Sequence, residues 1–438
     1  MQHRIARIVV PALALLAAAP AHAQERLSAE ERRIVAWIDA NADGAVGLLE
    51  RIVNVNSGTL NPEGVREVGR ILEAPLDSLG FDARWIALPD SLRRAGHLFA
   101  YRQGTRGKKV LLIGHLDTVF EKDSPFQRFV REGDVARGPG VNDMKGGDVV
   151  ILYALKALHS VGALRNTTIT VALTGDEEAP GRPLEIARRE LIEAGRASDV
   201  ALEFETGSRD RETGRDFATI ARRSSSAWTL SVRGRTGHSS GVFGQGSGSG
   251  AIYEAARILN AFHEELRGEQ YLTFNPGMIL GGTDVVWDTA QSRGTAFGKT
   301  NVIAQTALVT GDIRTLTDEQ LQRTRQRMRE IVARHLPQTE ADITFSDGYP
   351  SMPPTPGNAA LLERLNQVNR ALGLAPMEAF DPGRRGAADV SFVAPYVDAI
   401  AGMGAHGGGA HAPGEWVDLS TLPLQIKRAA LLIYRLTR

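Results

Sequence analysis

The chain has 438 residues, with 51 Lys and Arg against 51 Asp and Glu, and no Cys. This length leaves room for two domains, and the formal net charge of zero argues against nucleic acid or an anionic membrane as the main partner. The absence of Cys excludes thiolate ligands and thiol nucleophiles, so any bound metal must be held by His, Asp and Glu.

The first 23 residues are typical of a secretory signal. Arg4 and Arg7 form a basic start, residues 8–19 are mostly apolar, and Ala21 and Ala23 offer a small-residue cleavage site. The alternative is a membrane anchor, but the apolar run is too short to span about 30 Å of hydrocarbon. We therefore expect cleavage and export, which would place the mature protein in the periplasm or outside the cell.

Hydrophobic periodicity then predicts an alternation of helices and strands. In chain order, we expect helices over 29–55 (broken at 41–44) and 61–79, strands over 83–88, 97–103 and 109–120, a long loop over 121–142, a helix over 146–158, a strand over 168–173, a helix over 184–194 and a strand over 199–204. This order favours the α/β class, with a mixed, largely parallel sheet flanked by helices.

The pattern changes near residue 217. Strands are expected over 220–234, 271–280, 302–313 and 342–347, with helices over 251–266 and 318–335. The resulting β-α-β-β-α-β order is that of a ferredoxin-like α+β unit. A helix over 358–372, a strand over 397–401 and a helix over 422–436 then return to the first pattern. The predicted organisation is a catalytic domain in two parts, 24–216 and 351–438, with a second domain, 217–350, inserted in it.

The predicted strand over 109–120 carries His115 and Asp117. Residues two apart in an extended chain point to the same side, and ligands gather beyond the carboxyl ends of strands in open α/β sheets. A neutral imidazole is a common metal ligand, and a nearby carboxylate can fix its tautomer. Taken alone, the pair is also compatible with an ordinary strand-end His that bonds to an Asp.

More side chains of ligand type follow other predicted strands or lie in glycine-rich loops. They are Asp143 before a helix, Glu177 and Glu178 after the strand over 168–173, Glu205 after the strand over 199–204, and His411 in a triglycine loop. Each alone has an ordinary alternative: a helix cap, a solvated acidic turn, a carboxylate facing water or a loop His. Together they put two His and five carboxylates at one sheet edge, where the carboxylates would repel one another without cations. Nitrogen and oxygen ligands without sulfur suit zinc, cobalt or manganese.

Five motifs carry a resemblance to a known family. They are Gly-His-Leu-Asp-Thr-Val at 114–119, Gly-Pro-Gly-Val-Asn-Asp-Met-Lys-Gly-Gly at 138–147, Gly-Asp-Glu-Glu at 175–178, Phe-Glu at 204–205 and Gly-Gly-Gly-Ala-His at 407–411. In order and spacing they resemble those of the clan MH co-catalytic zinc metallopeptidases. The resemblance is closest to the glutamate carboxypeptidase branch, carboxypeptidase G included, with aminoacylases and succinyl-diaminopimelate desuccinylases as relatives. It covers nearly all of the chain after residue 23.

The resemblance implies two zinc ions, for which cobalt or manganese could substitute. Asp143 would bridge both ions, His115 and Glu205 would complete one site, and Glu178 and His411 would complete the other. The peptide bond after the bridging aspartate is expected to be cis.

The same resemblance implies catalytic roles. Asp117 would orient His115, and Glu177, next to a ligand but not itself one, would be the general base. His238 matches a family histidine that reaches into the active site, often that of the partner subunit, and helps to polarise the scissile carbonyl. The alternative for His238 is a surface histidine beside a turn.

Substrate-binding positions lie in the inserted domain. Arg314 and Asn301 match family positions that hold the free carboxylate of the substrate, a task that suits a guanidinium fork. A salt-bridged Arg and a turn Asn are the alternatives. The Gly/Ser run at 244–250, an anion cradle or a flexible loop, departs from the Asn-Ala pair with which the family commonly opens the next helix, so substrate choice stays open. The Arg pair at 384–385 could bind a carboxylate or be solvated.

These features predict an exported, dimeric two-zinc hydrolase that cleaves an amide bond next to a free C-terminal carboxylate in short peptides or N-acyl amino acids. An aminoacylase or a dipeptidase is the enzymatic alternative. A non-catalytic binding homologue is disfavoured because all the implied ligands, Asp117 and Glu177 are present. We expect a homodimer formed through the inserted domain, no nucleic acid partner, and no membrane contact after signal cleavage.

Overall fold

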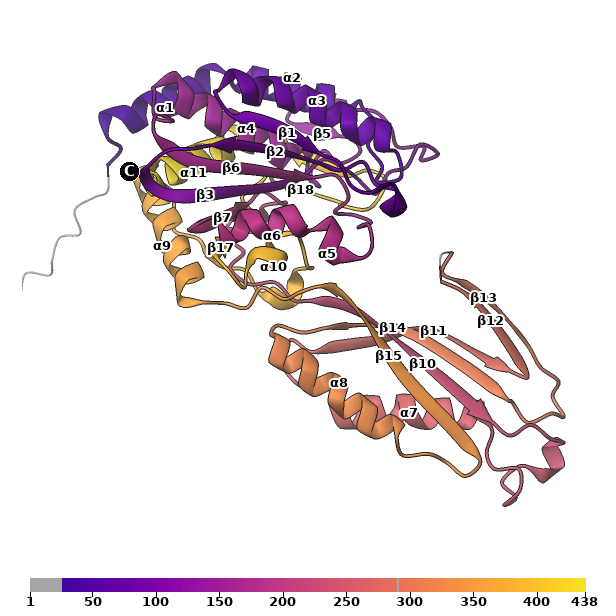
Figure 1. Ribbon diagram of the computed structural model, residues 1–438. Helices are drawn as coiled ribbons and strands as arrows, with labels where there is room; N and C mark the ends of the chain where they lie inside the picture. Colours follow the sequence, from indigo (N-terminus) through magenta and orange to yellow (C-terminus); the bar gives the residue numbers. More distant parts are fainter. Residues whose placement is uncertain (1–25, 290) are drawn as a thin grey trace, which may run out of the picture.

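A computed structural model describes residues 26–289 and 291–438 (Figure 1), so the predicted signal at 1–23 lies outside the described residues. The larger of two structural units is built on a six-stranded sheet with the order β1-β2-β6-β3-β7-β17. Its strands are β1 (Asp82–Ile86), β2 (His97–Arg102), β3 (Arg106–His115), β6 (Thr167–Thr174), β7 (Val200–Glu203) and β17 (Asp398–Ile400). Four of them run parallel, whereas β1 and β2 pair antiparallel at one edge.

Helices cover both faces of this sheet (Figure 1). Buried side chains alternate along β3, so Leu112 faces one helical layer and Leu111 the other. The first layer holds α1 (Ala29–Ala40), α2 (Ala42–Val53), α3 (Pro62–Ser78), α4 (Lys145–Ser160) and α11 (Leu422–Leu436). The second holds α5 (Leu184–Ala187), α6 (Arg189–Arg196) and α10 (Val390–Val393), while α9 (Pro356–Ala371) packs against β17 and α11. The predicted α/β class is confirmed.

Local sequence explains where the first helices begin. Ser28 caps α1 through a hydrogen bond from the backbone N–H of Glu31, whose side chain accepts one from the backbone N–H of Ser28. Asn61 caps α3, and Pro62 occupies its first turn, where a missing N–H costs nothing.

Three predicted elements differ from the structure. β3 ends at His115, so the chain beyond it is irregular and is held by the site described below. The loop over 121–142 contains β4 (Val130–Glu132) and β5 (Val135–Arg137), which form a small sheet with β19 (Trp416–Asp418) and β18 (Gly407–Gly408). The helix over 184–194 is broken at Arg188, whose buried guanidinium bonds to the buried carboxylates of Asp176 and Asp389.

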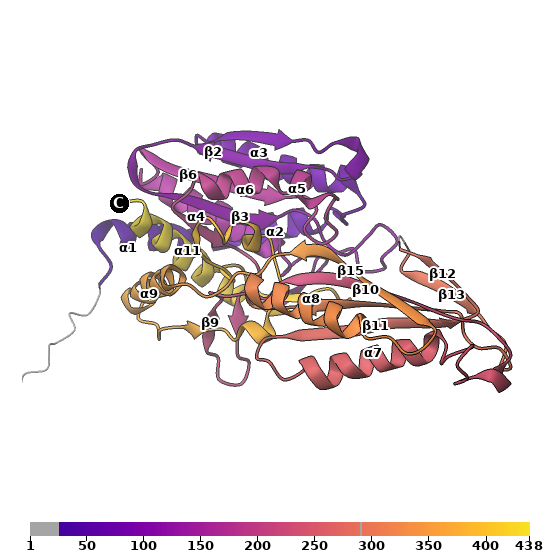
Figure 2. The same cartoon turned by 60° about the horizontal axis from the view of Figure 1, so that its bottom comes forward.

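The second unit has a four-stranded antiparallel sheet with the order β11-β14-β10-β15 and two helices on one face (Figure 2). Its elements are β10 (Ser225–Gly234), α7 (Ala251–Leu266), β11 (Thr273–Gly282), β14 (Thr306–Arg314), α8 (Asp318–Val332) and β15 (Thr339–Tyr349). This is the order expected of a ferredoxin-like unit. A hairpin of β12 (Asp284–Asp288) and β13 (Arg293–Phe297), not predicted, extends from it. The domain boundaries near 217 and 350 stay predictions.

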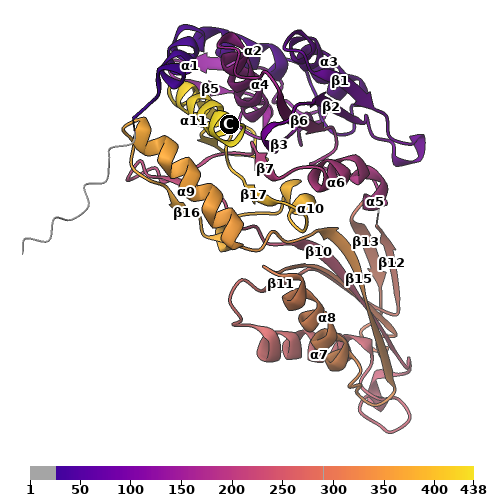
Figure 3. The same ribbon diagram turned by 60° about the vertical axis from the view of Figure 1, so that its left-hand side comes forward.

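The second unit projects from the first (Figures 1 and 3). The two chain segments that connect them pair with each other, because Arg222 and Met352 exchange backbone hydrogen bonds of 2.8 and 2.9 Å. The hydroxyl of Tyr349 adds a bond of 2.7 Å to the carbonyl of Glu177. Within the described ranges, no helix combines the length and apolar character needed to cross a membrane.

Candidate metal centre

The side chains predicted to bind metal come from separate segments that meet at the carboxyl edge of the large sheet. They are His115 at the end of β3, Glu178 after β6, Glu205 after β7, Asp143 before α4, and His411 between β18 and β19. Because β3, β6 and β7 are adjacent and parallel, their carboxyl ends bring three of these residues together. The peptide bond between Asp143 and Met144 is cis, as expected.

Asp143 lies between the two histidines. Its Oδ1 is 3.3 Å from His115 Nε2, and its Oδ2 is 3.2 Å from His411 Nε2. Glu205 Oε1 lies 3.4 Å from the same nitrogen of His115, and Glu178 Oε2 lies 3.0 Å from that of His411. Each carboxylate oxygen of Asp143 therefore faces its own His–Glu pair, as a carboxylate that bridges two cations would.

The ring of His115 is oriented by the residue two positions after it. Its Nδ1 lies 3.1 Å from the backbone carbonyl oxygen of Asp117, to which it donates, and 3.4 Å from the carboxylate of Asp117. The other ring nitrogen, Nε2, faces Asp143 and Glu205 and is the ring atom that remains to bind a metal ion. The backbone carbonyl of Asp117 is thus nearer to the ring than the carboxylate that was expected to orient it.

The Asp117 carboxylate organises the loop that follows β6. It accepts hydrogen bonds from the Thr59 hydroxyl (2.5 Å) and from the backbone N–H groups of Glu177 (3.0 Å) and Glu178 (3.1 Å). Burial raises the pKa of Asp117, but the nearby His115 ring and the hydrogen bonds from Thr59 and Glu178 outweigh burial and hold the pKa below its usual range. The ionised carboxylate therefore positions the two neighbouring glutamates.

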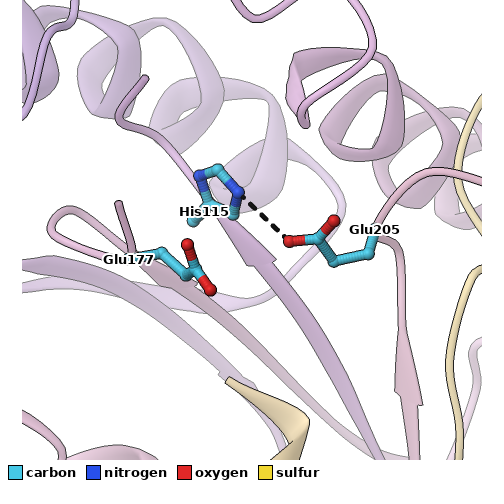
Figure 4. Close-up of side chains that lie close together, drawn as sticks. All are labelled: His115, Glu177 and Glu205. Carbon is cyan, nitrogen blue, oxygen red and sulfur yellow. Dashed lines mark ion pairs between the residues drawn. The ribbon is translucent and has the colours of Figure 1, made fainter. Parts of the chain in front are cut away.

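Glu177 and Glu205 turn their carboxylates toward the ring of His115 (Figure 4). One ligand atom from each of these three residues lies within 4.8 Å of the others, as is also true of His115, Asp143 and Glu178. By distance, Glu177 could therefore be a metal ligand as well as a general base. Burial raises its pKa well above the ordinary value, which suits a group that takes up a proton.

The cluster fits divalent metal ions. Two of its buried atoms, His115 Nε2 and Glu178 Oε1, have no hydrogen-bond partner, although buried polar atoms are almost always satisfied. Burial also raises the pKa of Glu178 to about 7, so a nearby cation would stabilise its charged form. A donor set of imidazole and carboxylate suits zinc, cobalt or manganese.

Glu415, which was not among the predicted residues, holds the loop that carries Asp143. Its buried carboxylate accepts hydrogen bonds from the backbone N–H groups of Gly140 (3.2 Å), Asn142 (2.7 Å) and Asp143 (2.8 Å). Burial raises the pKa of Glu415 to about 7. Its partners are backbone groups up to 275 residues away, which leave no pattern in the sequence.

A pocket of about 310 Å³ opens beside the cluster. Its walls include Asp143, Glu177, Glu205, His411, Arg222 and Arg385. The predicted Arg pair is split: Arg385 lines the pocket, whereas Arg384 is exposed and stacks 5.0 Å from the ring centre of Phe380. Arg222, also unpredicted, is buried and donates to Glu203 Oε2 at 2.7 Å.

His238 and Asn301 lie together in the second unit, away from this pocket. His238 is exposed and forms a backbone bridge with Val302, while the Ser239 N–H donates to the Asn301 carbonyl at 2.9 Å. The end of β10 that leads to them points away from the large sheet (Figure 1). Neither is among the described residues that line the pocket.

Arg314, at the end of β14, is also absent from the described lining of the pocket. Its Nε donates to Asp312 Oδ2 at 2.9 Å, and both side chains are partly exposed. This is the salt-bridged alternative that the sequence left open. The Gly/Ser run at 244–250 forms turns ahead of α7.

Comparison with known proteins identifies the family to which the chain belongs. Residues 111–435 match the model of peptidase family M20/M25/M40, which spans more than half of the chain. The chain is 28% identical over 395 residues to carboxypeptidase G2 from Pseudomonas sp. (strain RS-16), covering 88% of this chain and 87% of that protein. It is 27% identical over 414 residues to succinyl-diaminopimelate desuccinylase from Nitrosospira multiformis, covering 90% and 97%.

Solved structures share the fold. The Bacillus subtilis YXEP protein, described as a dinuclear metal binding peptidase from the M20 family, superposes with a TM-score of 0.62 at 15% identity, covering 91% of this chain and 99% of that one. Enzymes of this family depend on metal ions, and the cluster around His115 supplies candidate ligands. The resemblance inferred from the five motifs is confirmed, and the chain belongs to peptidase family M20/M25/M40, a family of hydrolytic enzymes.

Proposed function

We propose that this chain is an exported two-metal amidohydrolase that cleaves the amide bond next to a free C-terminal carboxylate. The observation that carries the proposal is the placement of Asp143, whose two oxygens face separate His–Glu pairs. His115 and Glu205 would hold one ion, Glu178 and His411 the other, and Asp143 both. The dinuclear metal site of the Bacillus subtilis relative supports a pair of ions, with zinc as our first choice.

Metal ions in this position would polarise the scissile carbonyl and acidify water. The carboxylate of Glu177 lies beside His115 and would take a proton from the attacking water and deliver it to the leaving amine. Asp117 holds the backbone of Glu177 in place, and Tyr349 holds its carbonyl. Glu415 fixes the loop of Asp143, so the ligand and the base are held by separate supports.

The relatives support two substrate classes. Similarity to a carboxypeptidase favours release of a C-terminal residue from a short peptide. Similarity to a desuccinylase favours an N-acyl amino acid, which is the alternative, together with a dipeptidase. In all of these, the scissile bond is an amide, so the proposed catalytic chemistry is the same.

A panel of matched substrates, assayed with zinc and with a chelator, tests this proposal. We expect cleavage of N-acetyl-alanyl-glutamate but not of its C-terminal amide, and loss of that cleavage in chelator. A requirement for a free N-terminal amine would instead indicate a dipeptidase, and cleavage of N-acetylglutamate alone an aminoacylase. If the zinc-loaded protein hydrolyses no amide in the panel, the proposed function is wrong.

We also propose a homodimer in which the second unit supplies His238 to the partner's site. Neither His238 nor Asn301 is among the described residues that line the pocket of their own chain, so a second copy that brings them to it would complete the site. Large apolar side chains are exposed on this unit, among them Phe243, Tyr253 and Ile279. β11 is an edge strand, which could pair with another chain.

Mixing two inactive variants tests this arrangement. A dimer of one Glu177→Gln chain and one His238→Ala chain contains one intact composite site. Because half of randomly mixed dimers are of this kind, activity should recover to about a quarter of wild type. No recovery after verified subunit exchange would show that His238 does not act across a dimer.

Export is proposed from the basic, apolar and small-residue pattern of residues 1–23. Sequencing the N-terminus of protein recovered from the periplasm or the medium should give Gln24 as the first residue. Retention of the full N-terminus in the cytoplasmic fraction would contradict export.

A further inference from the structure

The pocket beside the metal ligands has a second, basic wall that the proposed chemistry does not use. Arg385 donates from Nη2 to the backbone carbonyl of Thr206 at 2.5 Å, and no ion pair of Arg385 occurs among the described residues. Its Nε is buried and has no hydrogen-bond partner. Among the described residues, this guanidinium therefore has no directly bonded carboxylate of the kind that normally accompanies a buried charge.

Arg222 lines the same pocket as Arg385, but its guanidinium already donates hydrogen bonds to other groups of the protein. It donates to Glu203 Oε2 at 2.7 Å and to the Gly386 carbonyl at 3.0 Å, next to Arg385 in the chain. Its Nε, too, is buried without a partner. The pair therefore carries two guanidinium groups and one paired carboxylate, which leaves a net positive charge on this wall.

An anion that enters the pocket would lie beside the two arginines that line it, Arg222 and Arg385. The forked donors of arginine match the two oxygens of a carboxylate, and such pairs are stronger than neutral hydrogen bonds. The acidic residues of the opposite wall are the candidate metal ligands and base, so they are not available to pair with Arg385. Gly386 leaves open space beside it, since a Cβ there would meet no atom within 4 Å.

We propose that Arg385, backed by Arg222, binds a carboxylate of the substrate other than the one next to the scissile bond, so that the enzyme selects substrates with two acidic groups. This inference rests on the proposed function, because it places the scissile amide at the neighbouring metal ligands. It assigns a specificity residue to the larger unit, whereas the predicted carboxylate ligand Arg314 lies on the second unit. C-terminal glutamate and N-succinyl groups are the chemical classes that satisfy it.

Two pairs of substrates that differ by one charge test the proposal. N-acetyl-alanyl-glutamate is compared with N-acetyl-alanyl-glutamine, and N-succinyl-alanine with N-butanoyl-alanine. We expect the wild type to favour the charged member of at least one pair in kcat/KM by roughly 10- to 100-fold, the range of a charged hydrogen bond. Arg385→Gln should abolish that preference while leaving the uncharged member nearly unaffected.

Arg384→Gln is the matched control, because it removes the same charge one residue away, outside the pocket. It should keep the preference of the wild type. Zinc content and thermal unfolding are measured for each variant. They distinguish a loss of substrate binding from a loss of the structural contact between Arg385 and the Thr206 backbone. If Arg385→Gln lowers kcat/KM equally for both substrates of each pair, or if the wild type shows no preference, the proposal is overturned. Loss of zinc or of folding in both Arg385→Gln and Arg385→Lys would also overturn it, because Arg385 would then be structural.

Ligand binding distinguishes failure of this inference from failure of the proposed function. Titration calorimetry of the zinc-loaded protein with glutamate, glutamine and succinate needs no hydrolysis. We expect the two dicarboxylates to bind at least about 10-fold more tightly than glutamine, and Arg385→Gln to remove the difference. If no amide is cleaved but this difference is found, the proposed function fails and the anion site stands. If amides are cleaved and the difference is absent, only the anion site fails.

Discussion

Replacing Asp117 by Asn should weaken metal binding although Asp117 is not itself a ligand. Its two oxygens accept from different donors: Oδ1 from the Glu177 N–H, and Oδ2 from the Glu178 N–H and the Thr59 hydroxyl. In either orientation of an Asn side chain, its NH2 group faces one of the two backbone N–H groups. One buried donor therefore loses its acceptor, which costs about 1–3 kcal/mol, and the negative charge 3.4 Å from the His115 ring disappears.

We expect Asp117→Asn to lower the free energy of unfolding of the metal-free protein by about 2 kcal/mol and zinc affinity by roughly 10- to 100-fold. Urea unfolding and competition with a chromogenic chelator measure the two quantities. Thr59→Val is the matched control: it removes one bond but keeps the charge and both N–H acceptors, so zinc affinity should change less than about 3-fold. An unchanged zinc affinity in Asp117→Asn, or an equal loss in Thr59→Val, would show that the Asp117 carboxylate does not support the metal ligands.

Three further predictions concern the base, a buried ion cluster and a buried histidine. Glu177→Gln should keep its zinc and lose at least about 100-fold in kcat, as measured by metal analysis and turnover; substantial turnover would exclude Glu177 as the base. Arg188→Met should destabilise the protein by about 3–5 kcal/mol in urea, because it leaves two buried carboxylates unpaired, whereas exposed Arg189→Met should change stability by less than about 0.5 kcal/mol. Burial lowers the pKa of His406 to about 4. The unfolded chain therefore takes up a proton on this histidine below about pH 6.5, whereas the folded chain takes it up only near pH 4. The metal-free protein should therefore lose about 2 kcal/mol more between pH 7 and pH 5 than His406→Gln does, and equal losses would contradict this assignment.

The elements could be predicted where a single segment carries its own pattern. The apolar run of β3 alternates between two helical layers, and the ligand-type residues stand where β3, β6 and β7 end, so linear order already indicated one edge of one sheet. The hairpin of β12 and β13 was missed because its short strands are largely exposed and carry little apolar alternation.

The supports of the site could not be predicted, because they join segments far apart in the chain. Glu415 acts on backbone N–H groups, and Arg188 pairs with one carboxylate 201 residues away. The sequence also could not separate Arg384 from Arg385, since the direction of each side chain depends on the turn that precedes α10. Similarly, only the folded structure shows that the backbone carbonyl of Asp117 is nearer to the His115 ring than the Asp117 carboxylate is.

Anomalous diffraction from zinc-loaded crystals would show whether Asp143 bridges two metal ions. We expect two zinc peaks, one between Asp143 Oδ1, His115 and Glu205 and one between Asp143 Oδ2, His411 and Glu178. A single peak that does not contact Asp143, or no peak among these five side chains, would contradict it.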